Sequence, residues 1–283
     1  MAERDVLILE DDRQILEVLH RVFVAAGYNC VLAHDGREGL QVFRQTRPSL
    51  VVTELQIPAG GASDLVQEVR REDPDAAVIL LIRPADAKAA IACLKLGAYA
   101  CLMKPINGDE LLITAQRALE RRQLLIDRRQ HHDTPGRLCD TRQRDVLIVE
   151  EESGIRDLLH RVFLSAGYRC LLASDGEEGL RVFRESRPSL VVTDLGMPMR
   201  RHGPSERDAG IRLLQQIRRE DPDAAIILES GMADVQTMIK SLHLGAEAFL
   251  MKPLLVDELL ITAERAIERR QLLTERRRRL EGA

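Results

Sequence analysis

The sequence predicts an α/β protein made of two copies of one unit, each a five-stranded parallel sheet with helices on both faces. Two observations support this prediction. Residues 5–54 recur as residues 145–194 at a constant offset, with most positions identical. Within each copy, short apolar runs alternate with segments whose apolar residues recur at three- and four-residue spacing. Such an alternation is typical of parallel strands joined by right-handed helical crossovers.

In the first copy, the apolar runs predict strands at residues 6–9, 30–33, 50–53, 77–82 and 100–103. Several are almost wholly apolar, as expected for strands covered on both faces. Helices are predicted near residues 14–26, 38–46, 62–72, 87–96 and from 109 onward. Gly27 and Gly97 follow two of these helices, where a left-handed residue commonly ends the helix. The second copy gives the same prediction from residue 145 to about residue 270.

Composition limits the classes of protein that the chain can belong to. Its 283 residues, 45% hydrophobic and 30% charged, are typical of a globular protein of two domains. No apolar run approaches the ~18 residues of a membrane span, and no secretory signal is evident. Five cysteines without paired spacing favour a reducing, cytoplasmic setting. The net charge of -4 is too small to indicate a nucleic-acid partner.

The domain boundaries follow from the repeat. We expect a first domain at residues 1–126, a polar linker at 127–143 and a second domain at 144–283. The second domain carries an insertion, residues 199–209, expected as a mobile surface loop, and ends in an extended basic helix. Both last helices are expected to project beyond their domains, which makes a homodimer through the C-terminal helices possible, although no sustained heptad supports a coiled coil.

Polar residues that could carry chemistry stand at the predicted carboxyl ends of the strands in the second copy. Glu150 and Glu151 follow the first strand, Asp194 the third, Ser230 the fourth and Lys252 the fifth. The carboxyl ends of parallel strands lie at one edge of the sheet, where functional groups of α/β proteins collect. Carboxylates with one hydroxyl and one lysine suit a hard divalent cation such as Mg²⁺ together with a phosphoryl group. By itself, a lysine such as Lys252 is also typical of a solvated turn. The prediction therefore depends on its combination with the carboxylates and the hydroxyl.

This constellation, the TDLGMP segment and the LMKP ending make both copies resemble response-regulator receiver domains of two-component signalling. The resemblance implies the flavodoxin-like fold and makes Asp194 the phosphoacceptor. It implies that Glu150, Glu151, Asp194 and the backbone carbonyl of Gly196 hold Mg²⁺. It gives Ser230 and Lys252 the roles of phosphoryl-binding hydroxyl and lysine. Phe249 matches the family's switch aromatic. Taken by itself, a phenylalanine at this position is equally typical of a core residue.

Two features of the second copy depart from the family pattern. The acidic pair normally contains an aspartate, whereas Glu150 and Glu151 are both glutamates. The longer side chain of a glutamate must fold back to reach the same cation, which predicts weaker or altered metal binding. Glu229 also stands where the first copy has Leu81, and a further carboxylate would repel phosphate unless it pointed into solvent.

The first copy is a degenerate site. It keeps Glu10, Asp11 and Lys104, but Glu54 replaces the acceptor aspartate. The hydroxyl and the aromatic are also lost, because Ile82 and Cys101 stand at their positions. We expect a pseudo-receiver in which an ion pair between Glu54 and Lys104 holds one fixed state.

These features predict a stand-alone tandem receiver, not an enzyme, that takes a phosphoryl group from a histidine kinase or phosphotransfer protein. Its output would pass to a downstream signalling protein through protein contacts, and the 199–209 insertion would gate access to the acceptor. One alternative is a non-phosphorylated, dimerising scaffold. Another is a nucleic-acid-associated regulator that uses the arginines at residues 276–279, although such a run is more often a solvated helix end.

Overall fold

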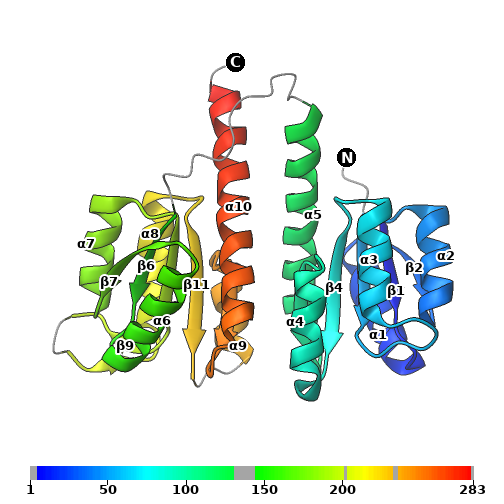
Figure 1. The fold of residues 1–283 in the computed structure, drawn as a ribbon, viewed down its shortest axis with the longest axis horizontal. Helices are drawn as coiled ribbons and strands as arrows, with labels where there is room; N and C mark the ends of the chain where they lie inside the picture. Colours follow the sequence, from blue (N-terminus) through cyan, green and yellow to red (C-terminus); the bar gives the residue numbers. More distant parts are fainter. Residues whose placement is uncertain (1–4, 131–143, 201–202, 232–234, 282–283) are drawn as a thin grey trace. The chain divides into compact units, whose positions relative to one another are not determined.

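The computed structural model describes residues 5–130, 144–200, 203–231 and 235–281 (Figure 1). The chain divides into two compact units, residues 1–133 and 134–283. Each unit contains a five-stranded, wholly parallel sheet with helices on both faces, so the fold class predicted from the sequence is confirmed.

In the first unit the strands lie in the order β2-β1-β3-β4-β5. The strands are β1 (Asp5–Leu9), β2 (Asn29–Ala33), β3 (Leu50–Glu54), β4 (Ala77–Ile82) and β5 (Ala100–Met103). The helices are α1 (Arg13–Ala25), α2 (Gly36–Thr46), α3 (Ala62–Glu72), α4 (Ala87–Lys95) and α5 (Gly108–Gln130), with a 3-10 turn at Pro84–Asp86.

The second unit repeats this topology, with the strand order β7-β6-β8-β11-β12. Its strands are β6 (Asp145–Val149), β7 (Arg169–Ala173), β8 (Leu190–Asp194), β11 (Ala225–Ser230) and β12 (Ala248–Met251). Its helices are α6 (Ser153–Ser165), α7 (Gly176–Ser186), α8 (Ala209–Glu220), α9 (Val235–His243) and α10 (Val256–Glu281).

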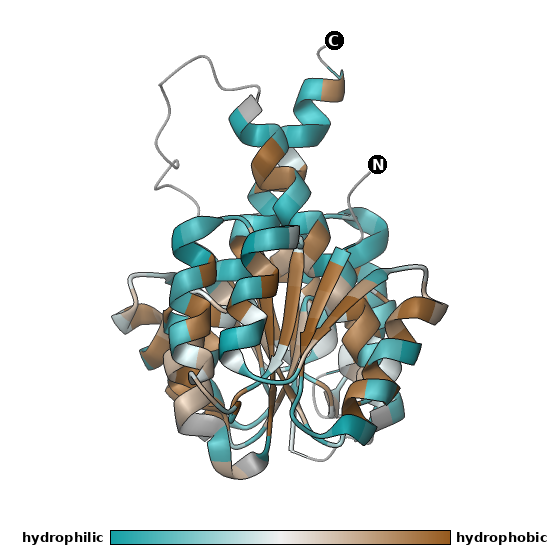
Figure 2. Ribbon diagram, turned by 90° about the vertical axis from the view of Figure 1, so that its right-hand side faces the viewer, coloured by the Kyte–Doolittle hydropathy of each residue, from teal (hydrophilic) through white to brown (hydrophobic). Residues whose placement is uncertain are grey.

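Alternate residues of each strand pack against opposite layers of helices. In β6, Leu147 and Val149 contact the core formed with α7 and α8, whereas Val146 and Ile148 contact the core formed with α6 and α10. Because both faces are covered, the central strands are apolar along their length, as Figure 2 shows. At the carboxyl ends of these strands the side chains become polar, and residues there build the site.

The helices begin and end where local chemistry favours it. Asp12 caps α1 by accepting hydrogen bonds from the backbone N–H groups of Gln14 and Ile15 at 2.8 and 3.2 Å. Gly27 and Gly97, predicted as left-handed positions, have φ of 81° and 109°. Most predicted helix and strand boundaries agree with the structure within one or two residues.

Arginines hold the last helix of each unit to that unit, and two pairs are equivalent in the two copies. The ion pairs are Arg122–Asp73 and Arg129–Asp75 in the first unit, and Arg270–Asp221 and Arg277–Asp223 in the second. Helix α5 therefore continues to Gln130, so the first four residues of the expected linker are helical. The rest of that expected linker, residues 131–143, lies outside the described residues. In α10, Arg277 and Arg279 of the basic end pair with acidic residues of the same unit.

A short antiparallel hairpin follows β8, and its second strand lies in the insertion, where the sequence predicts a loop. Strands β9 (Met197–Pro198) and β10 (Ser205–Glu206) pair with Ser205 opposite Pro198. Met197 is fully buried in the core under α7 and α8, and the base of the hairpin is anchored by the Glu177 N–H, which donates to the carbonyl of Met199 at 2.8 Å. The hairpin is therefore attached to the folded unit at its base.

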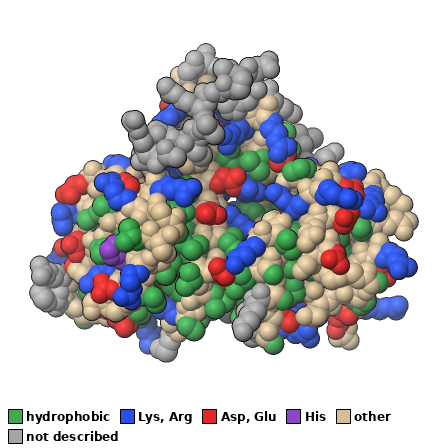
Figure 3. Space-filling view, in the orientation of Figure 1, with side chains coloured by type: hydrophobic (Ala, Val, Ile, Leu, Met, Phe, Trp, Pro, Cys, Tyr) green, Lys and Arg blue, Asp and Glu red, His purple; other side chains and the backbone are tan. Residues whose placement is uncertain are grey.

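Two surface properties bear on the partner classes. Within the part of the chain that the structure describes, no helix combines the length and apolar character needed to cross a bilayer. On the face drawn in Figure 3, basic and acidic side chains of the described residues are interspersed. That face therefore lacks the single-sign field by which proteins attract nucleic acid over a distance.

Candidate functional site

The parallel topology brings the chemistry-bearing residues of each unit to one edge of its sheet. Glu150 follows β6, Asp194 ends β8, Ser230 ends β11 and Lys252 follows β12. Asp194 lies in register with Glu229 of β11. Four segments far apart in the sequence thus meet because neighbouring strands end together.

In the second unit, Lys252 joins two of the predicted site carboxylates. Its Nζ lies 2.7 Å from Oε2 of Glu150 and 3.0 Å from Oδ1 of Asp194. Glu150 is fully buried and Asp194 is 8% exposed. The other oxygen of Glu150 accepts the backbone N–H of Glu152 at 3.0 Å. Lys252 is thus a structural partner of both carboxylates, not a solvated turn residue.

Burial acts on the protonation of these groups. It raises the pKa of Asp194 above its ordinary value; the Lys252 charge opposes this shift and the Glu150 charge adds to it. Burial alone would lower the pKa of Lys252, but the hydrogen bond to Glu150 and the charges of Glu229, Glu150 and Asp194 raise it. The lysine is therefore charged at neutral pH, and it favours the ionised form of Asp194 that nucleophilic attack requires.

Glu229 is a buried carboxyl beside this pair. It is fully buried, and neither of its oxygens has a hydrogen-bond partner among the residues that the structure describes. Burial raises its pKa to about 8, with Lys252 opposing and Glu150 and Asp194 adding to the rise. The sequence left open whether Glu229 points into solvent; it points into the protein.

Glu151 lies at the exposed edge of the site and contacts the insertion. The hydroxyl of Ser205, in β10, donates to Oε1 of Glu151 at 3.1 Å. The backbone around Glu151 is held by Arg156, whose Nη1 donates to the carbonyls of Glu150 at 2.6 Å and Glu151 at 3.2 Å. The insertion therefore reaches the acidic pair itself.

The remaining predicted residues of the second unit occupy the expected elements. Ser230 is 5% exposed at the end of β11. Gly196 is the second residue after β8, and no atom lies within 4 Å of the position that a Cβ would take there. Phe249, half-buried in β12, packs against the core formed with α7 and α8.

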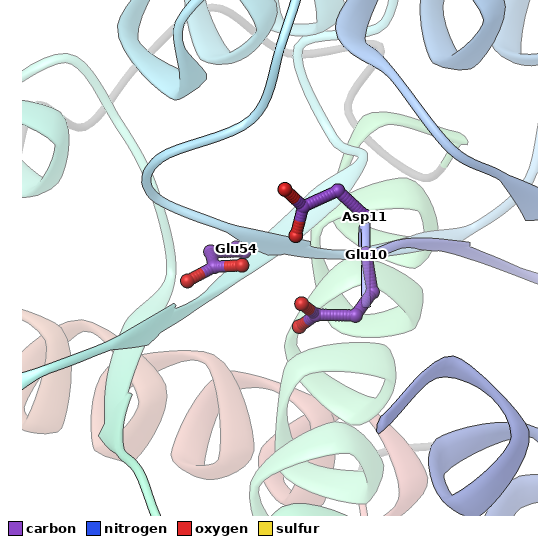
Figure 4. A group of neighbouring side chains, drawn as sticks. All are labelled: Glu10, Asp11 and Glu54. Atoms are coloured by element: carbon purple, nitrogen blue, oxygen red, sulfur yellow. The ribbon is translucent and has the colours of Figure 1, made fainter. Parts of the chain in front are cut away.

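The first unit carries a tighter group of carboxylates. Ligand oxygens of Glu10, Asp11 and Glu54 lie within 4.8 Å of one another, and Figure 4 shows the three carboxylates converging. Lys104 Nζ lies 3.0 Å from both Glu54 Oε1 and Glu10 Oε2. The ion pair expected between Glu54 and Lys104 is therefore present, and Glu10 shares it.

Protonation in the first unit is divided between two glutamates. Burial, with the hydrogen bond to Glu54, raises the pKa of Glu10 to about 7. Burial alone would raise the pKa of Glu54, but hydrogen bonds with Glu10 and Lys104 and the charge of Arg83 lower it. Glu54 is thus the carboxylate that stays ionised opposite Lys104.

The other two first-copy substitutions remove a hydroxyl and an aromatic ring. Ile82, at the end of β4, is 6% exposed and has no hydroxyl. Cys101, in β5, is half-buried and its thiol lies 3.9 Å from the carbonyl of Ala90.

The oxygen donors of the second unit are of the type that a hard divalent cation takes, although among the described residues the close group of three acidic ligands is the one in the first unit. Three buried carboxyls, Glu150, Asp194 and Glu229, face a single ammonium group, that of Lys252. Among the described residues the oxygens of Glu229 have no hydrogen-bond partner, so the protein itself leaves this buried carboxyl unsatisfied. All-oxygen donors in this number are those that Mg²⁺ prefers.

Sequence reasoning missed Ser205 and Arg156 as site residues. Arg156 replaces Leu16 of the first copy, so comparison of the repeats contained a signal for it. Ser205 lies in the insertion and has no counterpart in the first copy. Its contact with Glu151 depends on how the hairpin folds, which no local pattern predicts.

The family described as response regulator receiver domain matches the chain twice, at residues 6–116 and 146–264. The chain belongs to this family. Its two receiver domains connect it with two-component signalling, and receiver domains generally bind Mg²⁺ at an acidic site of the kind described above.

Curated relatives agree with this assignment. The chain is 35% identical over 114 residues to the "Probable transcriptional regulator ycf27" of Porphyridium aerugineum, covering 40% of this chain and 44% of that protein. It is 31% identical over 123 residues to the "Regulatory protein AtoC" of Escherichia coli K12, covering 44% of this chain and 25% of that protein. The chain thus spans less than half the length of either relative.

A similar solved structure is a response regulator receiver domain protein from Clostridium thermocellum. It is 28% identical, with a TM-score of 0.42, and the match covers 43% of this chain and 98% of that one.

Proposed function

We propose that the second receiver domain accepts a phosphoryl group on Asp194 from a histidine kinase or a phosphotransfer protein, within a stand-alone tandem receiver. The observation that carries the proposal is the placement of Lys252 Nζ at 3.0 Å from Asp194 Oδ1, at the sheet edge where Ser230 also ends its strand. The first copy lacks both the aspartate and the hydroxyl.

The chemistry is transfer of a phosphoryl group to a carboxylate. An ionised oxygen of Asp194 attacks phosphorus, the bond from phosphorus to the donor's imidazole nitrogen breaks, and the nitrogen keeps the electron pair. Lys252 pairs with the oxygens of the transferred group as a point charge, and the Ser230 hydroxyl donates to one of them.

Mg²⁺ is the cofactor of the proposal. Glu150, Glu151, Asp194 and the carbonyl of Gly196 would hold it. When bound, the cation screens the repulsion between the Asp194 carboxylate and the incoming phosphoryl group.

The first receiver domain has a different role in the proposal. Glu54 stands where the second copy has the acceptor Asp194, and it pairs with Lys104 at 3.0 Å. With Ile82 and Cys101 in place of the hydroxyl and the aromatic, this domain serves as a fixed interaction module.

Output passes to a downstream signalling protein through protein contacts. The added charge at Asp194 draws the Ser230 hydroxyl toward it, and Phe249, on the neighbouring strand, follows into the vacated space. The surface around β11, α9 and β12 then carries the change.

Paired variants test the proposal. We expect acetyl phosphate with Mg²⁺ to add one phosphoryl group to the wild-type chain, as measured by intact mass. Asp194→Asn should abolish the addition, and Glu54→Gln, the matched control in the first domain, should leave it unchanged. Addition to Asp194→Asn, or its loss in Glu54→Gln, would contradict the proposal.

A second candidate is a non-phosphorylated scaffold that dimerises through its last helices. Burial at this edge favours it, because burial raises the pKa of Asp194 and so disfavours the ionised form that attack on phosphorus requires. If the chain is such a scaffold, no donor should add a phosphoryl group, and light scattering should give the mass of a dimer.

A further inference from the structure

We propose that Ser205 is a positioning residue for Glu151, and that the β9–β10 hairpin is a built-in part of the cation site of the second receiver domain. This inference rests on the proposed function for its cation, and it assigns to the insertion a role in building the site.

The first step is the contact itself. Ser205 Oγ donates to Glu151 Oε1 at 3.1 Å, which leaves Oε2 of the same carboxylate available as a ligand. Hydrogen bonds to ligating carboxylates orient them and raise metal affinity in many proteins. An exposed glutamate benefits most, since nothing else restricts its side chain.

The second step is the comparison of the two copies. The first copy has Asp11, whose short side chain brings its carboxylate within 4.8 Å of those of Glu10 and Glu54, and it has no insertion. The second copy has Glu151, one methylene longer, and the insertion that supplies Ser205. The longer ligand and its anchor thus occur together in one copy and are both missing from the other.

The third step is the anchoring of the hairpin. Met197 is buried in the core, and the Met199 carbonyl accepts from the Glu177 N–H at 2.8 Å. At the same end, Arg200 pairs with Glu177 at 2.7 Å. Ser205 is held opposite Pro198 in the ladder. Ser205 is therefore presented by a secured element, as a positioning residue must be.

The fourth step is the need for a cation at this place. Both oxygens of the fully buried Glu229 are unpartnered, and Lys252 is the single ammonium among three buried carboxyls of the described site. A cation bound by Glu150, Asp194 and the anchored Glu151 would offset the negative charge at this edge of the sheet.

The test measures Mg²⁺ affinity by isothermal titration calorimetry in the full-length chain carrying Asp11→Asn, so that the heat reports the second domain. We expect Ser205→Ala to weaken binding about tenfold and Ser205→Thr, which keeps the hydroxyl, to restore it. In a Glu151→Asp background, Ser205→Ala should have little effect, because the shorter ligand does not use the anchor.

Unchanged or tighter Mg²⁺ binding by Ser205→Ala would overturn the inference, and so would an equal loss in the Glu151→Asp background. Ser205 is exposed, so the fold should tolerate these changes; circular dichroism of each variant checks it. Phosphorylation of the same variants at saturating Mg²⁺ reports the proposed function separately. A chain that shows the expected affinity pattern but accepts no phosphoryl group refutes the function and leaves the positioning role in place.

Discussion

At the residue scale, the difference between the copies comes down to a few side chains at one sheet edge. Lys104 and Lys252 bridge equivalent carboxylates at 3.0 Å, although their acceptor positions hold Glu54 and Asp194. From the sequence we could predict which strand ends carry these side chains. The burial of Glu229 could not be predicted, because an alternating strand pattern does not say whether a terminal residue is covered by the neighbouring helix and loop.

Glu229 leads to a stability prediction with a defined pH window. Its pKa in the folded chain is about 8, against an ordinary value of 4.5. Between these values the folded state binds more protons than the unfolded state, so this group makes the free energy of unfolding fall as pH rises, and the loss is complete above pH 8.

Glu229→Leu, which installs the residue found at position 81 of the first copy, should remove this dependence. We expect it to raise the free energy of unfolding at pH 8 by about 1–3 kcal/mol, and to change it much less at pH 5. Urea unfolding at the two pH values in EDTA measures the effect. An equal effect at both pH values would mean that Glu229 is not a protonated buried acid.

At the element scale, nearly all of the fold could be predicted from the sequence, because apolar strands and amphipathic helices each have a distinct period. The boundaries that differ have tertiary causes. Helix α5 continues past its predicted end because Arg129 forms an ion pair with Asp75. Ser205 and Glu206 of the insertion form β10 and pair with β9, which immediately precedes the insertion, although the Gly, Pro and charge content of the insertion predicts a loop.

The arginines of α10 give a prediction about that helix. Arg270 is 18% exposed, pairs with Asp221 at 2.8 Å and also donates to the carbonyl of Pro188. Arg270→Ala should lower the free energy of unfolding by about 1.5–3 kcal/mol, as expected for hydrogen bonds to a charged group.

The matched control is Arg277→Ala. Arg277 is 48% exposed in its pair with Asp223, so its loss should cost under about 1 kcal/mol. Denaturant unfolding of both variants measures the difference. If the two substitutions lower the free energy of unfolding equally, the ion pairs do not stabilise α10 in proportion to their burial.

At the scale of the whole molecule, one fold appears twice with different chemistry. Both units have the same strand order and the same arginine-held last helix. Only the second unit has an aspartate at the acceptor position, a hydroxyl after its fourth strand and a hairpin beside its acidic pair. The duplication thus separates a shared framework from the residues that differ in function.

The central claim is that the second receiver domain accepts a phosphoryl group and the first does not. The most direct test is to locate the phosphoryl group by peptide mass spectrometry. The full chain is saturated with acetyl phosphate and Mg²⁺, and the acyl phosphates are trapped by reduction with borohydride before digestion. The account predicts one modified peptide per chain, containing Asp194, with the Glu54 peptide unmodified. Modification of Glu54, or of neither peptide, would contradict it.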